Sequence, residues 1–125
     1  MSPATPPPRL PDYLRHLVLA IQRIQRYVAG LSATAFAADD KTQDAVLRNI
    51  EGIGEAARNV QRYHADFAAA QAQVPWAVMI GMRNRVSHGY FAVDWDLIWA
   101  TIQQDLPFLQ AQINALLIDQ GPADE

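Results

Sequence analysis

The sequence predicts an all-α protein, an up-and-down bundle of four to five helices. Apolar residues recur every three or four positions over long stretches, residues that cap or end helices separate these stretches, and no convincing pair of strands is visible. With 125 residues, half of them hydrophobic, the chain can bury a single core. We therefore expect one helical domain over residues 10–119, between a disordered proline-rich leader at 1–9 and a loose acidic tail at 120–125.

The first predicted helix begins near Asp12, after Pro11, and ends at Gly30, a residue that favours helix termination. We interpret His16, on this helix, as a partly exposed structural residue. The apolar stripe of the helix consists of Leu14, Leu17, Val18, Ile21, Ile24, Val28 and Leu31. A short connection over residues 31–38 follows it.

The second predicted helix begins at Asp40, because Asp40 and Gln43 resemble a capping box. Its stripe consists of Val46, Ile50, Ile53, Ala57 and Val60. Gly52 and Gly54 interrupt the helix, and each costs about 1 kcal/mol relative to alanine in a helix interior. We therefore expect a second helix to approach closely at these glycines, either within the bundle or across a dimer. Glu55 lies beside them, as an ordinary surface group, an arginine partner or part of a site.

One short helix and two longer ones complete the predicted bundle. The short helix lies within residues 63–74, and the next helix begins at Trp76, after a proline, and runs to about Ser87. Asp94 is the predicted N-cap of the final helix. Pro107 should kink that helix, because proline lacks the N–H that a helix interior needs. The final stripe consists of Leu97, Ile98, Thr101, Ile102, Leu106, Leu109, Ile113, Leu116 and Leu117.

The distribution of charge indicates one selective anionic site or an ion-paired interface. A net charge of −3 argues against a general nucleic-acid binder. However, every Lys and Arg lies at or before Arg85: residues 1–85 carry ten basic and seven acidic residues, whereas residues 86–125 carry six acidic residues and no basic ones. Nine of the ten basic residues are arginines, whose forked guanidinium suits phosphate and carboxylate.

Several classes of protein are excluded or disfavoured by composition and motif. The chain has no cysteine, so disulfides and thiolate chemistry are excluded. It has no apolar run long enough to span a bilayer, and its start lacks the layout of a signal peptide, so we expect a cytoplasmic protein without membrane association. No phosphate-binding loop or dinucleotide fingerprint is visible, so we expect no cofactor.

Residues 81–90, GMRNRVSHGY, combine a permanent cation, an imidazole and a phenol between apolar neighbours. Arg83 and His88 are five positions apart, roughly 140° around a regular helix, so they cannot share one face. Asn84 and His88 are four apart, so Asn84 can orient the imidazole. Arg83 would then approach a shared substrate from the side or from a second subunit. On the residues alone, this cluster is either a structural network or a site.

As a site, the cluster suits cleavage of a phosphodiester without a metal ion. His88 could take a proton from a ribose 2′-hydroxyl or give one to the leaving oxygen, since its ordinary pKa is near neutrality. Arg83 could stabilise the charge that builds on the phosphoryl oxygens. A metal site is less attractive, because the stretch contains one histidine and no carboxylate.

Residues 83–90 match the Arg-x4-His-x-Tyr motif, and the chain here resembles the HepT-type toxins of the HEPN superfamily. The resemblance extends beyond the motif. Residues 50–57 (IEGIGEAA) are similar to the family's IGEAA helix, residues 74–84 contain its PW and GMRN runs, and residues 93–107 are similar to its final helix. The resemblance covers about residues 10–118.

This resemblance implies an all-α homodimer with the two motifs facing each other in a shared cleft. It implies a metal-independent RNA endonuclease toxin of a type VII-like toxin–antitoxin system, with Arg83 and His88 as catalytic residues and Asn84 in support. It also implies a minimal nucleotidyltransferase antitoxin that transfers AMP from ATP to Tyr90. The added phosphate would repel RNA and block the site. Two alternatives remain: a non-catalytic helical partner or regulatory subunit of a nucleotidyltransferase, and a nucleotide-binding sensor.

Overall fold

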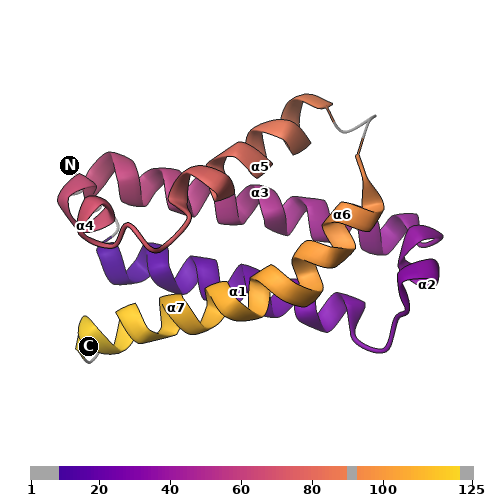
Figure 1. The fold of residues 1–125 in the computed structure, drawn as a ribbon, viewed down its shortest axis with the longest axis horizontal. Helices are drawn as coiled ribbons and strands as arrows, with labels where there is room; N and C mark the ends of the chain where they lie inside the picture. Colours follow the sequence, from indigo (N-terminus) through magenta and orange to yellow (C-terminus); the bar gives the residue numbers. More distant parts are fainter. Residues whose placement is uncertain (1–8, 90–92, 122–125) are drawn as a thin grey trace, which may run out of the picture.

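The computed structural model describes residues 9–89 and 93–121 and is helical throughout, with no strand in these ranges (Figure 1). The all-α prediction is therefore confirmed. The predictions for residues 1–8, for Tyr90 and for residues 122–125 lie outside the described residues. The helices are α1 (Leu10–Val28), α2 (Ala33–Ala37), α3 (Asp40–Tyr63), α4 (Ala65–Ala70), α5 (Trp76–Gly89), α6 (Trp95–Ala100) and α7 (Leu106–Asp119), with a π-helical turn at Thr101–Asp105 between the last two.

The four long helices α1, α3, α5 and α7 alternate in direction (Figure 1). α3 packs against both α1 and α5, and α7 packs against the other side of α1. In Figure 1, the C-terminal half of α5 rises away from the rest of the bundle. The apolar stripes predicted for the first two helices are largely buried, and α2 and α7 complete the core. The largest fully buried side chains are Phe36, Leu14, Leu17, Ile21, Ile24, Ile113, Val46 and Val60.

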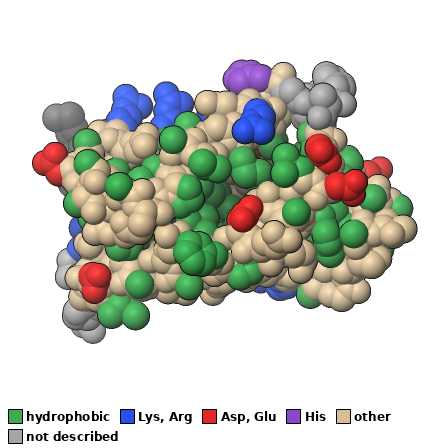
Figure 2. Space-filling model, viewed as in Figure 1, with side chains coloured by type: hydrophobic (Ala, Val, Ile, Leu, Met, Phe, Trp, Pro, Cys, Tyr) green, Lys and Arg blue, Asp and Glu red, His purple; other side chains and the backbone are tan. Residues whose placement is uncertain are grey.

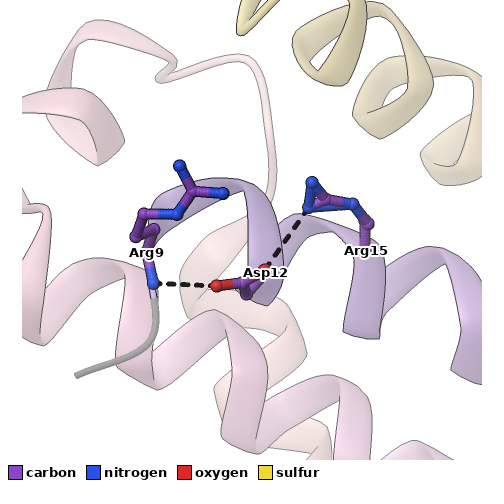
Figure 3. A network of polar contacts seen from close by, with 3 residues as sticks. All are labelled: Arg9, Asp12 and Arg15. Atoms are coloured by element: carbon purple, nitrogen blue, oxygen red, sulfur yellow. Dashed lines mark hydrogen bonds and ion pairs between the residues drawn. The ribbon is translucent and has the colours of Figure 1, made fainter. Parts of the chain in front are cut away.

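The side chain of Asp12 caps the start of α1 (Figure 3). Asp12 Oδ2 accepts a hydrogen bond from the backbone N–H of Arg9 at 3.0 Å, and Asp12 Oδ1 lies 3.4 Å from Arg15 Nη1. A carboxylate in the first turn is also favoured by the helix dipole. The end of α1 is as predicted, because Gly30 follows Val28 with a φ of 79°, a conformation that suits glycine.

The second long helix, α3, begins at Asp40 as predicted, but the predicted capping box is wrong by one residue. Asp39 is the N-cap, with its carboxylate accepting from the backbone N–H of Thr42 at 3.1 Å and from the Thr42 hydroxyl at 2.7 Å. These hydrogen bonds hold the pKa of Asp39 below its ordinary value. Gln43 is buried instead, and its amide donates to the carbonyls of Phe36 and Ala37 at 2.9 and 3.0 Å. The bond to Phe36 is buried, and a buried carbonyl needs a hydrogen-bond partner, which the Gln43 amide supplies.

The two glycines of α3 have different surroundings. A Cβ at Gly54 would overlap the Cβ of Arg83 and lie 2.9 Å from the carbonyl oxygen of Met79, so α5 contacts α3 closely at this point. The predicted close approach is confirmed at Gly54, within one protomer. At Gly52 a Cβ would meet nothing within 4 Å, so no second helix of the same protomer comes close there, and contact across a dimer stays a prediction.

The predicted final helix is divided by the π-helical turn that precedes Pro107. Asp94 caps its start as predicted, with Oδ1 accepting from the N–H of Leu97 at 3.1 Å. The N–H of Leu106 bonds to the carbonyl of Thr101, five residues earlier. Proline cannot donate to the carbonyl four residues before it and its ring crowds that group, so a wider turn relieves the clash. The expected distortion thus takes the form of a π-helical turn.

Candidate functional site

Arg83 lies on the face of α5 that packs against α3. The apolar positions of this face are Trp76, Met79 and Val86, which are 4%, 5% and 6% exposed. Arg83 falls between Met79 and Val86 at helical spacing, so its stem passes over Gly54 where α3 has no side chain. An arginine among core positions can bury its aliphatic stem and still carry its charged end to the surface.

The guanidinium of Arg83 reaches a carboxylate on α3. Its Nε lies 3.3 Å from Oε2 of Glu55, and the side chains are 27% and 51% exposed. Its Nη1 also donates to Oδ1 of Asn84 at 3.3 Å. Of the three interpretations of Glu55, the structure thus supports that of an arginine partner. Because both partners are partly exposed, solvent screens this ion pair and it stabilises the fold only slightly.

His88 lies on another side of α5. It is exposed and, with Asn84 and Leu97, lines a groove of about 550 Å³ between α5 and α6. Since α5 remains regular to Gly89, the predicted separation of Arg83 and His88 around the helix holds. Among the described residues, Asn84 is bonded to Arg83, and no hydrogen bond joins it to His88. The structure thus joins Arg83 to Asn84 by a hydrogen bond, places Asn84 and His88 in one groove, and leaves Arg83 and His88 in different grooves.

Arg83 also lines a polar groove that the sequence did not predict, called here the α1–α3 groove. This groove has a volume of about 770 Å³. Its charged and histidine side chains are His16 and Arg23 from α1, Arg48, Glu51 and Glu55 from α3, and Arg83 from α5. The sequence does show that the members of each polar pair share one face of a helix, because His16 and Arg23 are seven residues apart, as are Arg48 and Glu55. The sequence could not show that the two polar stripes face one groove.

An apolar surface lies between α5 and the α6–α7 segment. Val78, Leu97 and Phe108 are 60%, 51% and 69% exposed there. Val78 and Phe108 line a second groove of about 550 Å³ between α5 and α7, and Met82 is shared with the groove of His88. Figure 2 shows hydrophobic side chains around the hollow at the centre of the view, and basic side chains along the edge formed by α3 and α5. Exposed apolar side chains gathered in this way are typical of an interaction surface.

The chemistry offered by these residues is that of a proton carrier and a permanent cation. An exposed imidazole can exchange protons with a bound hydroxyl, and a guanidinium can bind a phosphate. In the parts of the chain that the structure describes, no three residues of the types His, Cys, Asp and Glu gather where they could bind a metal ion. None of the helices described there combines the length and hydrophobicity that crossing a bilayer requires.

The sequence pattern of one protein family, described as "Ribonuclease HepT-like", matches residues 17–116. Among curated relatives, the "Probable ribonuclease HepT" of Thermococcus cleftensis is 36% identical over 105 residues, which are 84% of this chain and 93% of the relative. A "Putative RNase" of Caldanaerobacter subterraneus subsp. tengcongensis is 34% identical over 84% of this chain and 91% of its own. Another, from Methanocaldococcus jannaschii, is 36% identical over 90% of this chain and 91% of its own. No solved structure gives a significant match.

Proposed function

The chain belongs to the HepT-like ribonuclease family, and we propose that it is an endoribonuclease that cleaves RNA with Arg83 and His88 and without a metal ion. One observation carries this proposal: both side chains reach the surface from one end of one helix, and each lines a groove. Neither side chain is sealed in the core, so both are accessible to a substrate.

In the proposed reaction, an imidazole removes the proton from a ribose 2′-hydroxyl. The 2′-oxygen attacks the adjacent phosphorus, the bond from phosphorus to the 5′-oxygen breaks, and that oxygen takes a proton from an imidazolium. His88 is the group that exchanges these protons. Arg83 binds the non-bridging oxygens as negative charge builds on them. Asn84 holds the guanidinium through the hydrogen bond at 3.3 Å and therefore acts as a positioning residue.

We propose that the active unit is a homodimer that buries the apolar surface between α5 and α7. Within one protomer Arg83 and His88 lie on different sides of α5, so one protomer's pair is poorly placed to share a scissile phosphate. A second copy is the occupant that supplies the missing group. The exposed Val78, Leu97 and Phe108 provide an apolar core for such an interface, and Leu97 also lines the groove of His88.

Mixing two inactive variants tests this shared site. Arg83→Ala and His88→Ala dimers are unfolded together, refolded and assayed on RNA. If each site takes Arg83 from one protomer and the partner subunit's His88, a mixed dimer retains one intact site, and random mixing restores about a quarter of wild-type activity. If each site belongs to one protomer, every site lacks a group and no activity returns.

The ribonuclease itself is tested with a fluorogenic single-stranded RNA in the presence of a chelator. We expect cleavage to fall by about 10²–10⁴-fold in His88→Ala and by roughly 10²–10³-fold in Arg83→Ala. Thermal unfolding of both variants checks that the fold is kept. Folded variants that cleave as fast as wild type would remove these residues from the mechanism. No cleavage by wild type would favour the alternative, a non-catalytic partner of a nucleotidyltransferase.

We propose further that the chain is the toxin of a toxin–antitoxin pair whose nucleotidyltransferase antitoxin adds AMP to Tyr90. Tyr90 follows His88 by two positions in the sequence. A phosphate added there would carry negative charge to the end of α5 and repel RNA. Mass spectrometry after incubation with the transferase and ATP should show one added AMP, and Tyr90→Phe should prevent it. Equal labelling of the Phe variant would place the modification elsewhere.

A further inference from the structure

We propose that the α1–α3 groove binds the backbone of single-stranded RNA next to the scissile phosphate. This inference rests on the proposed function, because it takes RNA as the substrate. It adds a second binding region, built by Arg23 and Arg48 and continuous with Arg83.

The groove runs along two helices that lie side by side. Ala20 and Arg23 on α1 line it together with Arg48 and Gly52 on α3, while His16 marks its other end beside Asn59. Seven residues separate His16 from Arg23, which corresponds to about 10 Å along a helix. A groove of this length and shape suits a short stretch of extended single-stranded RNA.

The positive charge of the groove is available to a ligand. Among the described residues, no ion pair is recorded for Arg23 or Arg48, and both are exposed. The carboxylate of Glu55 is paired with Arg83, so Glu51 is the one acidic lining residue that remains outside a recorded ion pair. Guanidinium groups facing one groove from neighbouring helices can hold phosphate oxygens through charge-assisted hydrogen bonds.

The groove leads to the motif helix at two points. Arg83 enters it from α5 above Gly54. Arg48 also lines a neighbouring hollow of about 390 Å³, whose other wall includes Ser87, the residue before His88. RNA bound at Arg48 is thereby led toward Arg83 and toward Ser87 on the motif helix. This continuity distinguishes the groove from a patch of unrelated surface charges.

A protein partner fits the groove less well than RNA. Protein interfaces bury apolar side chains at their centre. The exposed Val78 and Phe108, which suit such an interface, lie on the apolar surface between α5 and the α6–α7 segment, outside the α1–α3 groove. The α1–α3 groove has one exposed large apolar residue, Leu19, and otherwise offers guanidinium groups, the amide of Asn59 and the side-chain oxygen of Asn49. Amides can donate to and accept from sugar hydroxyls and base edges.

Gly52 keeps the floor of the groove open. A Cβ there would meet nothing within 4 Å, so a side chain can be added without a clash. A large side chain at this position would occupy the space between Arg48 and Glu55. Gly52→Trp therefore blocks the groove by bulk, independently of charge, and replaces a glycine that is unfavourable in a helix.

The test measures the binding and cleavage of a single-stranded RNA of a dozen nucleotides. Arg23→Gln/Arg48→Gln and Gly52→Trp are compared with Arg58→Gln, which removes an exposed arginine of α3 outside the groove. Binding is measured in the His88→Ala background at several salt concentrations. We expect the double variant to bind about tenfold more weakly. The slope of log affinity against log salt concentration should become shallower by about 0.7 for each phosphate that the variant no longer binds.

With His88 intact, the defect should appear in KM more than in kcat. Gly52→Trp should reproduce this defect and the shallower salt dependence, because RNA kept out of the groove no longer reaches its arginines. If wild-type protein cleaves RNA and both groove variants bind it as Arg58→Gln does, the groove proposal is overturned and the ribonuclease stands. If wild type fails to cleave but binding still depends on the groove, the ribonuclease fails and the groove stands. If the groove variants fail to bind the nucleotidyltransferase but still bind RNA, the groove is a protein-docking site and the proposal is overturned.

Discussion

Substitution of Gly54 by alanine tests the close contact between α3 and α5 that places Arg83. The new methyl group would overlap the Cβ of Arg83, lie 3.0 Å from its Cγ and lie 2.9 Å from the carbonyl oxygen of Met79. The carbonyl belongs to the backbone of α5, so relief requires the helix to move. Overpacking of this kind costs roughly 2–3 kcal/mol.

Alanine also favours the helix over glycine by about 1 kcal/mol, which offsets part of this cost. The net expectation for Gly54→Ala is a destabilisation of about 1–2 kcal/mol, or a fall in Tm of roughly 5 °C. Gly52→Ala is the matched control, two residues away in the same helix. It gains the same helical preference without a clash, so its stability should rise by up to about 1 kcal/mol.

The assay is urea unfolding followed by far-ultraviolet circular dichroism, at one protein concentration, because formation of the proposed dimer would contribute to stability. The same samples are then assayed on RNA, where Gly54→Ala should be impaired because Arg83 is displaced with α5. If Gly54→Ala is as stable as Gly52→Ala, the two helices are not in the close contact described, and the account of how Arg83 reaches its groove fails.

Further predictions concern the ion pair, the α3 cap and the dimer. Glu55→Gln removes the carboxylate beside Arg83, so RNA binding should strengthen several-fold while the free energy of unfolding changes by less than about 1 kcal/mol; weaker binding would show that Glu55 is needed to place the guanidinium. The pKa of Asp39 is lowered by Thr42, so its contribution to stability is present above the ordinary carboxylate pKa and is lost as pH falls through the acidic range. As pH falls, the free energy of unfolding should therefore decrease more steeply for wild type than for Asp39→Asn. Parallel curves of this free energy against pH would contradict the prediction. Phe108→Glu places a charge on the exposed apolar surface and should shift sedimentation from dimer to monomer and abolish cleavage; an unchanged dimer would place the interface elsewhere.

Much of the fold was predictable because helices leave a periodic pattern in sequence. The buried stripes of α1 and α3, the end of α1 at Gly30 and the cap at Asp94 all follow from local rules. The capping box at Asp40 and Gln43 was wrong because Gln43 has a choice of partners. The carbonyls of Phe36 and Ala37 bind the Gln43 amide instead, and only folding brings them to it.

The arrangement of the proposed site residues was only partly predictable. The separation of Arg83 from His88 follows from helix geometry alone. The difference between Gly52 and Gly54 does not, because it depends on where α5 lies over α3. The α1–α3 groove was missed for the same reason. Arg23 and Arg48 each look like ordinary surface charges until the two helices are set side by side.

The π-helical turn at Thr101–Asp105 gives α6 a different orientation from α7. An i→i+5 turn holds one residue more than an α-helical turn, so it rotates everything before it relative to everything after. α7 packs on α1. α6 takes a different direction and packs Trp95 and Trp99 against the aromatic ring of Phe36. α6 also forms one wall of the groove that His88 lines. Deleting a single residue from this turn would therefore leave α7 packed on α1 and rotate α6 away from the imidazole of His88.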